Sequence, residues 1–108
     1  SVMGRAERLK GHSWEREVAI RIREIDPRAK RLLEYQEGMG IDIDTTLPIS
    51  IQCKAMAKPN FIKAFNEAKN GKKEGNEPIG AFKVDRKGKF MLVDFDFGIK
   101  LLKNYFIK

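Results

Sequence analysis

The stretch that decides the fold is residues 41–54, which read IDIDTTLPISIQCK. Apolar residues occupy the odd positions and polar residues the even positions on both sides of Leu47-Pro48. Side chains of a strand alternate between its two faces, so this pattern predicts two half-buried strands joined by a hairpin turn at Leu47-Pro48. One face of the hairpin is then apolar. The polar side chains on its other face are Asp42, Asp44, Ser50, Gln52 and Lys54.

This polar face predicts a site for a cation. A register that keeps the two apolar faces together sets Asp42 and Asp44 across from Gln52 and Lys54. Carboxylate and amide oxygens suit a hard cation such as magnesium, which can polarise a phosphodiester and lower the pKa of a bound water. The lysine could orient that water or balance charge that develops on the phosphate. The alternation alone, however, favours solvent-facing charges that pair across the strands with little effect on stability.

A helix is expected before this hairpin, from about Glu7 to Ile25. Its apolar stripe consists of Trp14, Val18, Ile22 and Ile25. Asp26-Pro27 should end the helix, because the residue before a proline is pushed out of the α region. A short strand at Ala29–Tyr35 then leads into a glycine-bearing loop at Glu37–Gly40.

A second helix, a second hairpin and a final helix are expected after residue 54. The second helix runs from Pro59 to about Gly71, and its apolar side consists of Phe61, Ile62, Phe65 and Ala68. A turn at residues 85–88 joins strands at Ile79–Val84 and Phe90–Phe95. Asp96 would cap a short last helix that ends at Leu102. This order predicts an α/β fold with one mixed sheet of about five strands flanked by helices.

The composition bounds the class of protein. A chain of 108 residues fits a single domain, spanning residues 1–108, with a real core. Its net charge of +7 favours a polyanionic partner, although a lysine-rich solvated surface explains the charge equally well. Cys53 is the only cysteine, which excludes an internal disulfide and suits a reducing compartment such as the cytoplasm. No apolar run is long enough to span a bilayer, so no membrane partner is expected.

Two sequence motifs resemble those of a known nuclease superfamily. GIDI at residues 40–43, followed by IQCK at residues 51–54, resembles the PD-(D/E)xK signature in its Mrr-type form, where glutamine replaces the acidic member. KGHSWERE at residues 10–17 resembles the opening of archaeal and phage Holliday junction resolvases. The similarity extends roughly from Leu9 to Leu102 and includes the order of elements and the basic hairpin at Lys83–Lys89. The resemblance therefore implies a restriction-endonuclease-like fold.

The resemblance also implies a role for each residue of the motifs. Asp42 would be the principal ligand of a magnesium or manganese ion, and Gln52 would occupy the second ligand position. The backbone carbonyl of Cys53 would be a third ligand, and Glu15 would complete the site from the first helix, as a better placed residue than Glu17. Lys54 would be the catalytic lysine.

Asp44 is a further candidate ligand. Gln52 brings no charge to the site, and Asp44 lies on the same predicted face, where it would compensate for the missing carboxylate. Glycine and isoleucine precede Asp42 in place of proline. The sequence therefore leaves open whether Asp42 or Asp44 is the main ligand.

The resemblance implies branched DNA, such as a four-way junction, as the substrate. A metal-activated water would cut a phosphodiester and leave a 5′ phosphate. Two symmetric cuts need two active sites, so a homodimer is expected, with an apolar patch at Phe95, Phe97, Tyr105 and Phe106. The candidate DNA contacts are Lys10, His12, Gln36, Lys58, Arg86 and Lys87. A phage protein that acts in the host cytoplasm would fit this pattern.

Three other functions remain open at this point. One is a restriction-type or nicking nuclease with the same fold, although no appended recognition domain is recognisable. Another is a DNA-binding module without activity, which the neutral Gln52 would explain. The third, a basic adaptor between proteins, has no sequence feature in its favour.

Overall fold

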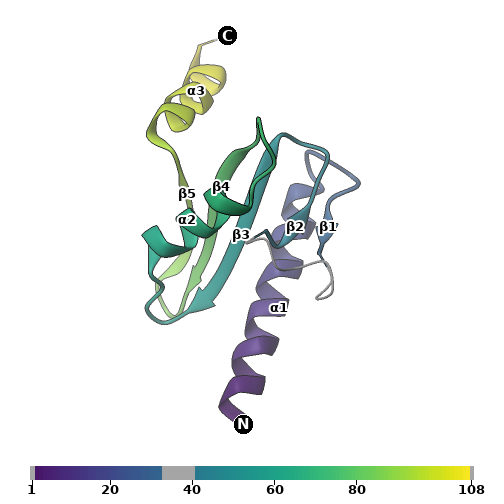
Figure 1. The fold of residues 1–108 in the computed structure, drawn as a ribbon, viewed down its shortest axis with the longest axis vertical. Coiled ribbons are helices and arrows are strands. Elements are labelled where there is room, and N and C mark those ends of the chain that lie inside the picture. Colours follow the sequence, from purple (N-terminus) through teal and green to yellow (C-terminus); the bar gives the residue numbers. More distant parts are fainter. Residues whose placement is uncertain (1, 33–40, 108) are drawn as a thin grey trace.

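The computed structural model describes residues 2–32 and 41–107, so Gln36 and the loop Glu37–Gly40 lie outside the described residues. The helices and strands are α1 (Val2–Ile22), β1 (Lys30–Arg31), β2 (Ile43–Asp44), β3 (Ile49–Met56), α2 (Phe61–Gly71), β4 (Glu77–Val84), β5 (Gly88–Val93) and α3 (Phe95–Phe106). Their order along the chain is the predicted one (Figure 1). The α/β class and the second hairpin, β4–β5, are therefore confirmed.

The strands form two sheets within the described residues, so a single sheet of about five strands is wrong. In the larger sheet the order is β3-β4-β5, with β3 parallel to β4 and β4 antiparallel to β5. β1 and β2 form a separate antiparallel pair, so the predicted hairpin of the two strands on either side of Leu47-Pro48 is wrong too: β2 pairs with β1 and not with β3. After Asp42 the chain turns away from the edge of β3. The loop that follows β2 is bound to Asp26 instead, because the Thr45 hydroxyl and the Thr46 N–H both donate to the Asp26 carboxylate, at 2.7 and 2.8 Å.

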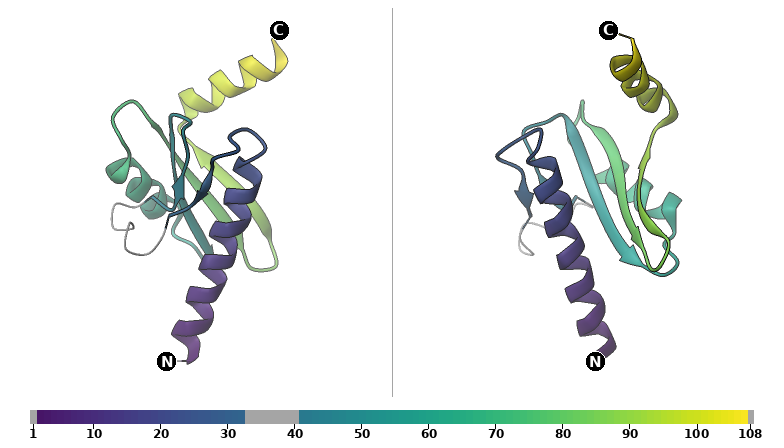
Figure 2. Two further views of the ribbon diagram at one scale, coloured as in Figure 1. Left: turned by 90° about the vertical axis from the view of Figure 1, so that its right-hand side faces the viewer. Right: turned by 180° about the vertical axis from the view of Figure 1, so that it is seen from behind.

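α1 covers one face of the larger sheet (Figure 2). Trp14, Val18 and Ile22 are buried there, as the stripe predicted, and the indole N–H of Trp14 donates to the carbonyl of Ala81 at 3.0 Å. Ile25 was also expected in the stripe, but it is exposed. α1 ends at Ile22, so the path of the chain no longer turns the side chain of residue 25 toward the sheet.

α2 covers the opposite face of the sheet, and small residues make its contact. Asn60 caps the helix by accepting the N–H of Lys63, so the helix begins at Phe61 rather than at Pro59. Ala64 and Ala68 are its buried residues. The predicted apolar side is wrong at Ile62, which is 65% exposed. Phe61 is partly exposed, but its ring packs edge-on against the buried Phe82, with 4.7 Å between the ring centroids.

Gly80 on β4 shows how tightly the face under α2 is packed. The ring of the fully buried Phe82 lies over Gly80, and a Cβ at residue 80 would be 2.7 Å from that ring. Gly80 is the register partner of Gln52 on β3. Because residue 80 has no side chain, the ring of Phe82 can lie over β4, beside the strand β3 that carries Gln52.

The last helix stands beyond the end of the sheet (Figures 1 and 2). Its N-terminal cap is Asp94 rather than the predicted Asp96: the Asp94 carboxylate accepts the N–H groups of Asp96 and Phe97. None of its residues is buried. Among the described residues, no helix is long and apolar enough to cross a membrane.

Candidate functional site

The residues of the motif meet at the open edge of β3. The backbone N–H of Asp42 donates to the carbonyl of Ile51 at 2.8 Å, and the Asp42 carboxylate accepts the N–H of Cys53 at 2.7 Å. Asp42 therefore lies beside residue 52, on the edge of β3 that β4 does not occupy. The N–H and C=O of one strand residue point to the same side, so the carbonyl of Cys53 is directed to this edge too.

Gln52 is a buried polar residue, only 6% exposed. Its amide N–H₂ donates to the Glu67 carboxylate at 3.0 Å, which fixes the orientation of the amide because a carboxylate can only accept. Its Oε1 is buried and has no hydrogen-bond partner among the described residues. A buried acceptor left without a partner costs about 1–3 kcal/mol, so this oxygen favours a bound cation or donor.

Lys54 and Gln52 share a contact that the sequence did not reveal. The ammonium of Lys54 lies 3.4 Å from the same Oε2 of Glu67 that accepts from Gln52. Glu67 comes from α2, three residues after the buried Ala64 and next to the buried Ala68. Glu67 could have been recognised in the sequence as an acidic residue on the same helix face as the small residues Ala64 and Ala68.

Glu15 reaches the site from α1. It is buried and lies 3.6 Å from the guanidinium Nε of Arg31 on β1, a second residue that the motifs did not include. Glu17, the weaker candidate, pairs instead with Lys89 on β5 at 2.6 Å. The two glutamates of α1 therefore face different parts of the molecule, and Glu15 is the one near β3.

The buried thiol of Cys53 is influenced by two of the acidic residues. Burial raises its pKa well above the ordinary value, and the negative charges of Asp42 and Glu15 raise it further. Both carboxylates therefore act on the same part of β3. A thiol with a raised pKa stays protonated, which makes its sulfur a poor metal ligand and leaves the backbone carbonyl as the only donor that Cys53 offers.

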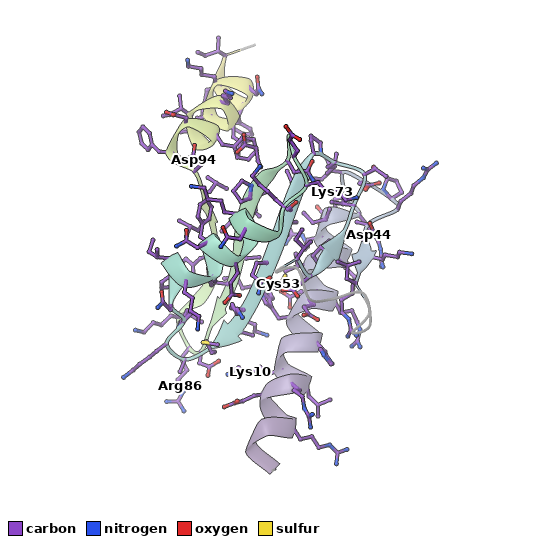
Figure 3. The ribbon with its side chains drawn as sticks, in the orientation of Figure 1. Lys10, Asp44, Cys53, Lys73, Arg86 and Asp94 are labelled. Carbon is purple, nitrogen blue, oxygen red and sulfur yellow. The ribbon has the colours of Figure 1, made fainter. Side chains whose placement is uncertain are left out.

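Asp44 lies apart from this group. It is exposed and is the register partner of Lys30 on β1, with the carboxylate 4.0 Å from the ammonium. Figure 3 shows Asp44 on the side of β2, away from Cys53 on β3. The predicted register, with both aspartates across from Gln52 and Lys54, is thus met by Asp42 beside residue 52 but not by Asp44.

The oxygen donors of the site fit a hard cation. Among residues 2–32 and 41–107, no three side chains of His, Cys, Asp or Glu lie close enough together to hold a metal ion. A cation at the edge of β3 would therefore need the amide oxygen of Gln52 and the carbonyl of Cys53 beside carboxylates. Such mixed oxygen donors are usual ligands of magnesium, and the buried, unpartnered Oε1 of Gln52 fits that role.

The candidate DNA contacts lie on several elements. Lys10 pairs with Asp85 at 2.5 Å, which ties α1 to the β4–β5 turn and brings Lys10 and Arg86 to the same end of the molecule (Figure 3). Arg86 is exposed, with a positive φ of 62°, and Lys87 and Lys58 are exposed too. His12 is half-buried on α1.

Comparisons of the chain with protein-family models, with curated proteins and with solved structures found no match. Its function must therefore be inferred from chemistry. The relevant groups are the carboxylates of Glu15, Asp42 and Glu67, the amide of Gln52 and the ammonium of Lys54. Gln52, Lys54 and Glu67 meet on the face of β3 that α2 covers, and Asp42 lies at the free edge of this strand. Glu15 lies on α1, over the opposite face (Figure 2).

Proposed function

We propose that this protein is a metal-dependent DNA endonuclease that cuts branched DNA, as a Holliday junction resolvase does. The observation that carries the proposal is the Asp42 carboxylate held 2.7 Å from the backbone N–H of Cys53, between the two residues Gln52 and Lys54. The residues of the GID…QxK pattern, separated by nine residues in sequence, are thus neighbours in space. If the alternating pattern belonged only to a solvent-facing surface, all of these polar side chains would be exposed, whereas Gln52 is buried.

The residues that would hold a magnesium or manganese ion are Asp42, Gln52, Glu15 and the carbonyl of Cys53. When bound, such an ion supplies positive charge that polarises a phosphodiester and favours deprotonation of water. Asp42 is already oriented by the N–H of Cys53, and the amide of Gln52 by Glu67. Both oxygen donors are therefore positioned before any ligand binds, which is what a site of fixed geometry requires.

Lys54 would act on the phosphate and on the attacking water. Its ammonium can orient the water or balance the negative charge that develops on the phosphate oxygens. Glu67 holds the ammonium 3.4 Å away and adds the negative charge that Gln52 lacks. Hydrolysis would leave a 5′ phosphate, as the resemblance to the superfamily implies.

The net charge of +7 supports a polyanionic substrate. Lys10, Lys58, Arg86 and Lys87 are the described basic residues that we expect to contact DNA phosphates. Two symmetric cuts in one junction require two active sites, so the enzyme would act as a homodimer. The reducing compartment expected from the single cysteine, such as a host cytoplasm, is compatible with DNA as the substrate.

A labelled synthetic four-way junction tests the proposal, with linear duplex as the control substrate, in magnesium, in manganese and in EDTA. Asp42→Ala and Lys54→Ala should each lower cleavage of the junction by at least about 100-fold, the size expected for loss of a preorganised group that stabilises charge. Asp44→Ala is the matched control, because Asp44 lies apart from Gln52, and it should keep most of the activity.

The alternatives predict other results. Equal cutting of duplex and junction would favour a restriction-type or nicking nuclease. Junction binding without cutting in any metal would mean that the neutral Gln52 marks a DNA-binding module without activity. Loss of cleavage in Asp44→Ala but not in Asp42→Ala would overturn the site described above.

A further inference from the structure

A pocket of about 490 Å³ lies where the start of α2 meets β5, on the face of the sheet that α2 covers. Phe61 and Phe90 line it and are 41 and 50% exposed. The half-buried Leu92 and the buried Val84 line it too. Sites for small molecules have volumes of about 300–1,000 Å³. The pocket is therefore large enough for a ligand and offers it two accessible aromatic rings.

Neighbouring residues hold both of these rings in place. Gly88, at the start of β5, has a positive φ of 127°, and a Cβ at this position would lie 3.6 Å from the ring of Phe90. The ring of Phe90 therefore lies over a residue that has no side chain to cover it. The ring of Phe61 packs edge-on against the buried Phe82, with 4.7 Å between the centroids. An exposed aromatic ring held in this way is a surface on which another flat ring can stack.

The charged side chains of the pocket are basic. Lys58 and Lys87 line it, and both are exposed. No aspartate or glutamate is among the described residues that line it. Asp85, in the turn that carries Lys87, is paired with Lys10 of α1. The pocket therefore suits a flat, largely apolar ring that has negative charge attached to it, which is the chemistry of a nucleotide.

The pocket lies on the same face of the sheet as Lys54. Phe90 on β5 is the register partner of Phe82 on β4, and Phe82 is the register partner of Lys54 on β3. Residues that face each other across neighbouring strands point to the same side of a sheet. Strands lie about 4.8 Å apart, so the backbone of Phe90 is about 10 Å from that of Lys54. A DNA strand bound at Lys54 is therefore close enough to place a nearby base in the pocket.

We infer that this pocket binds an unpaired base of the DNA, stacked on Phe90 and Phe61, while Lys58 and Lys87 contact the adjoining phosphates. The inference rests on DNA as the substrate in the proposed function, and it names the feature of branched DNA that the protein recognises. A paired base is covered by its stacked neighbours, so only a base that has left the duplex can enter a pocket. Every base has a π-face, so the pocket selects unpaired structure rather than sequence.

Binding of two fluorescent DNA probes, measured by anisotropy in EDTA so that no cleavage occurs, tests this inference. One probe is a duplex with a single unpaired thymidine in one strand. The other is the same duplex with an abasic nucleotide in that position, so the two probes have the same phosphates and differ by one base. The parent chain should bind the first probe at least about fivefold more tightly, which is the lower limit for one stacked base.

Variants of Phe90 show whether the pocket causes this preference. Phe90→Ala should bind the two probes equally, whereas Phe90→Tyr, which keeps an aromatic ring, should retain the preference. Phe95→Ala removes an exposed aromatic ring on α3, away from the pocket, and is the matched control that should behave as the parent chain does. Lys87→Gln should weaken the binding of both probes by the same factor, because it contacts phosphate. Circular dichroism should show unchanged secondary structure in Phe90→Ala, since residue 90 is half exposed.

Equal affinity of the parent chain for the two probes would overturn the inference, and so would a preference that survives in Phe90→Ala. A molar mass that rises with protein concentration in the parent chain but not in Phe90→Ala would assign the pocket to a contact between two copies, and would overturn it too. The nuclease proposal fails separately. A preference for the unpaired base without cleavage in any metal would support the inference and contradict the proposed function, and cleavage of the junction without this preference would do the reverse.

Discussion

β3 and the helix α3 both reverse the usual burial of side chains, but in opposite ways. Polar side chains are buried at β3, and apolar side chains are exposed on α3. On β3, polar Gln52 is 6% exposed, and Glu15 on the neighbouring helix α1 is also buried. On α3, apolar Phe106 is 73% exposed. A buried polar group and an exposed apolar patch are the two observations that say most about function, since neither stabilises the isolated chain. The first suggests a small ligand, and the second a macromolecular partner.

The two regions differ because of what packs on them. α2 lies close to β3 through Ala64 and Ala68, so the polar side chains between them are enclosed and need partners from α2. Nothing in the described structure packs on the outer side of α3. Local sequence is amphipathic in both regions, and only the neighbouring elements decide which face is buried.

A matched pair of phenylalanines gives the largest contrast. Phe82→Ala, in the core under α2, should lower the free energy of unfolding by about 3–5 kcal/mol, because Phe82 is fully buried. Phe106→Ala should change it by less than about 0.5 kcal/mol, because Phe106 is exposed on α3. Urea unfolding of both variants measures the difference. A similar loss at Phe106 would mean that α3 is packed on its own chain.

Glu67 allows a sharper test of the polar region. Glu67→Gln removes the charge that holds Lys54, and the cleavage rate should fall by about 10–100-fold, as for other residues that position a ligand or catalytic group. Junction affinity should change little, because Glu67 is not expected to contact phosphate. Lys69→Gln, on the exposed side of the same helix, is the control. Equal losses of affinity and rate would contradict a positioning role.

The smallest expected effect is confined to acid pH and concerns Asp26. Hydrogen bonds from the Thr45 hydroxyl and the Thr46 N–H hold the pKa of this carboxyl at about 2, below its ordinary value of 3.8. Because the folded pKa is lowered, the unfolded chain binds more protons between about pH 4 and pH 2, and stability rises with pH across that window. The stabilisation is complete above about pH 4 and is lost as the pH falls through about 2.

Urea midpoints of the parent chain and Asp26→Asn, measured from about pH 5 to pH 2, test this prediction. The Asn variant should be less stable at pH 5 and should lose less stability on acidification. Asp96→Asn, on exposed α3, should follow the parent chain. Parallel curves for the parent and Asp26→Asn would show that the Thr45 and Thr46 contacts do not stabilise the charged carboxylate.

Prediction from the sequence was most successful where one local pattern sufficed. Hydrophobic periodicity gave the order of the elements, the β4–β5 hairpin and three of the four residues of the α1 stripe. It was less successful at the ends of elements, where single hydrogen bonds decide. The cap at Asp94, two residues before the predicted Asp96, is such a case.

The residues of the candidate site were likewise only partly predictable from the sequence. The motif named Asp42, Gln52 and Lys54, and the structure brings Asp42 to the strand that carries the other two. Glu67 and Arg31 carry no motif and come from elements that are distant in sequence. Their contacts depend on how α2 and β1 pack, which no alternation pattern describes.

The sequence by itself determined the strands and helices, their order, and the polar identity of residues 42, 44, 50, 52 and 54, because these follow from side-chain periodicity and local turn chemistry. Only the tertiary structure decided which of those polar residues are buried. The parallel pairing of β3 with β4 requires a crossover helix on the sheet face, and α2 in that position encloses Gln52. The hydrogen bonds that hold Thr45 and Thr46 to Asp26 draw β2 away, and leave Asp44 outside with Lys30.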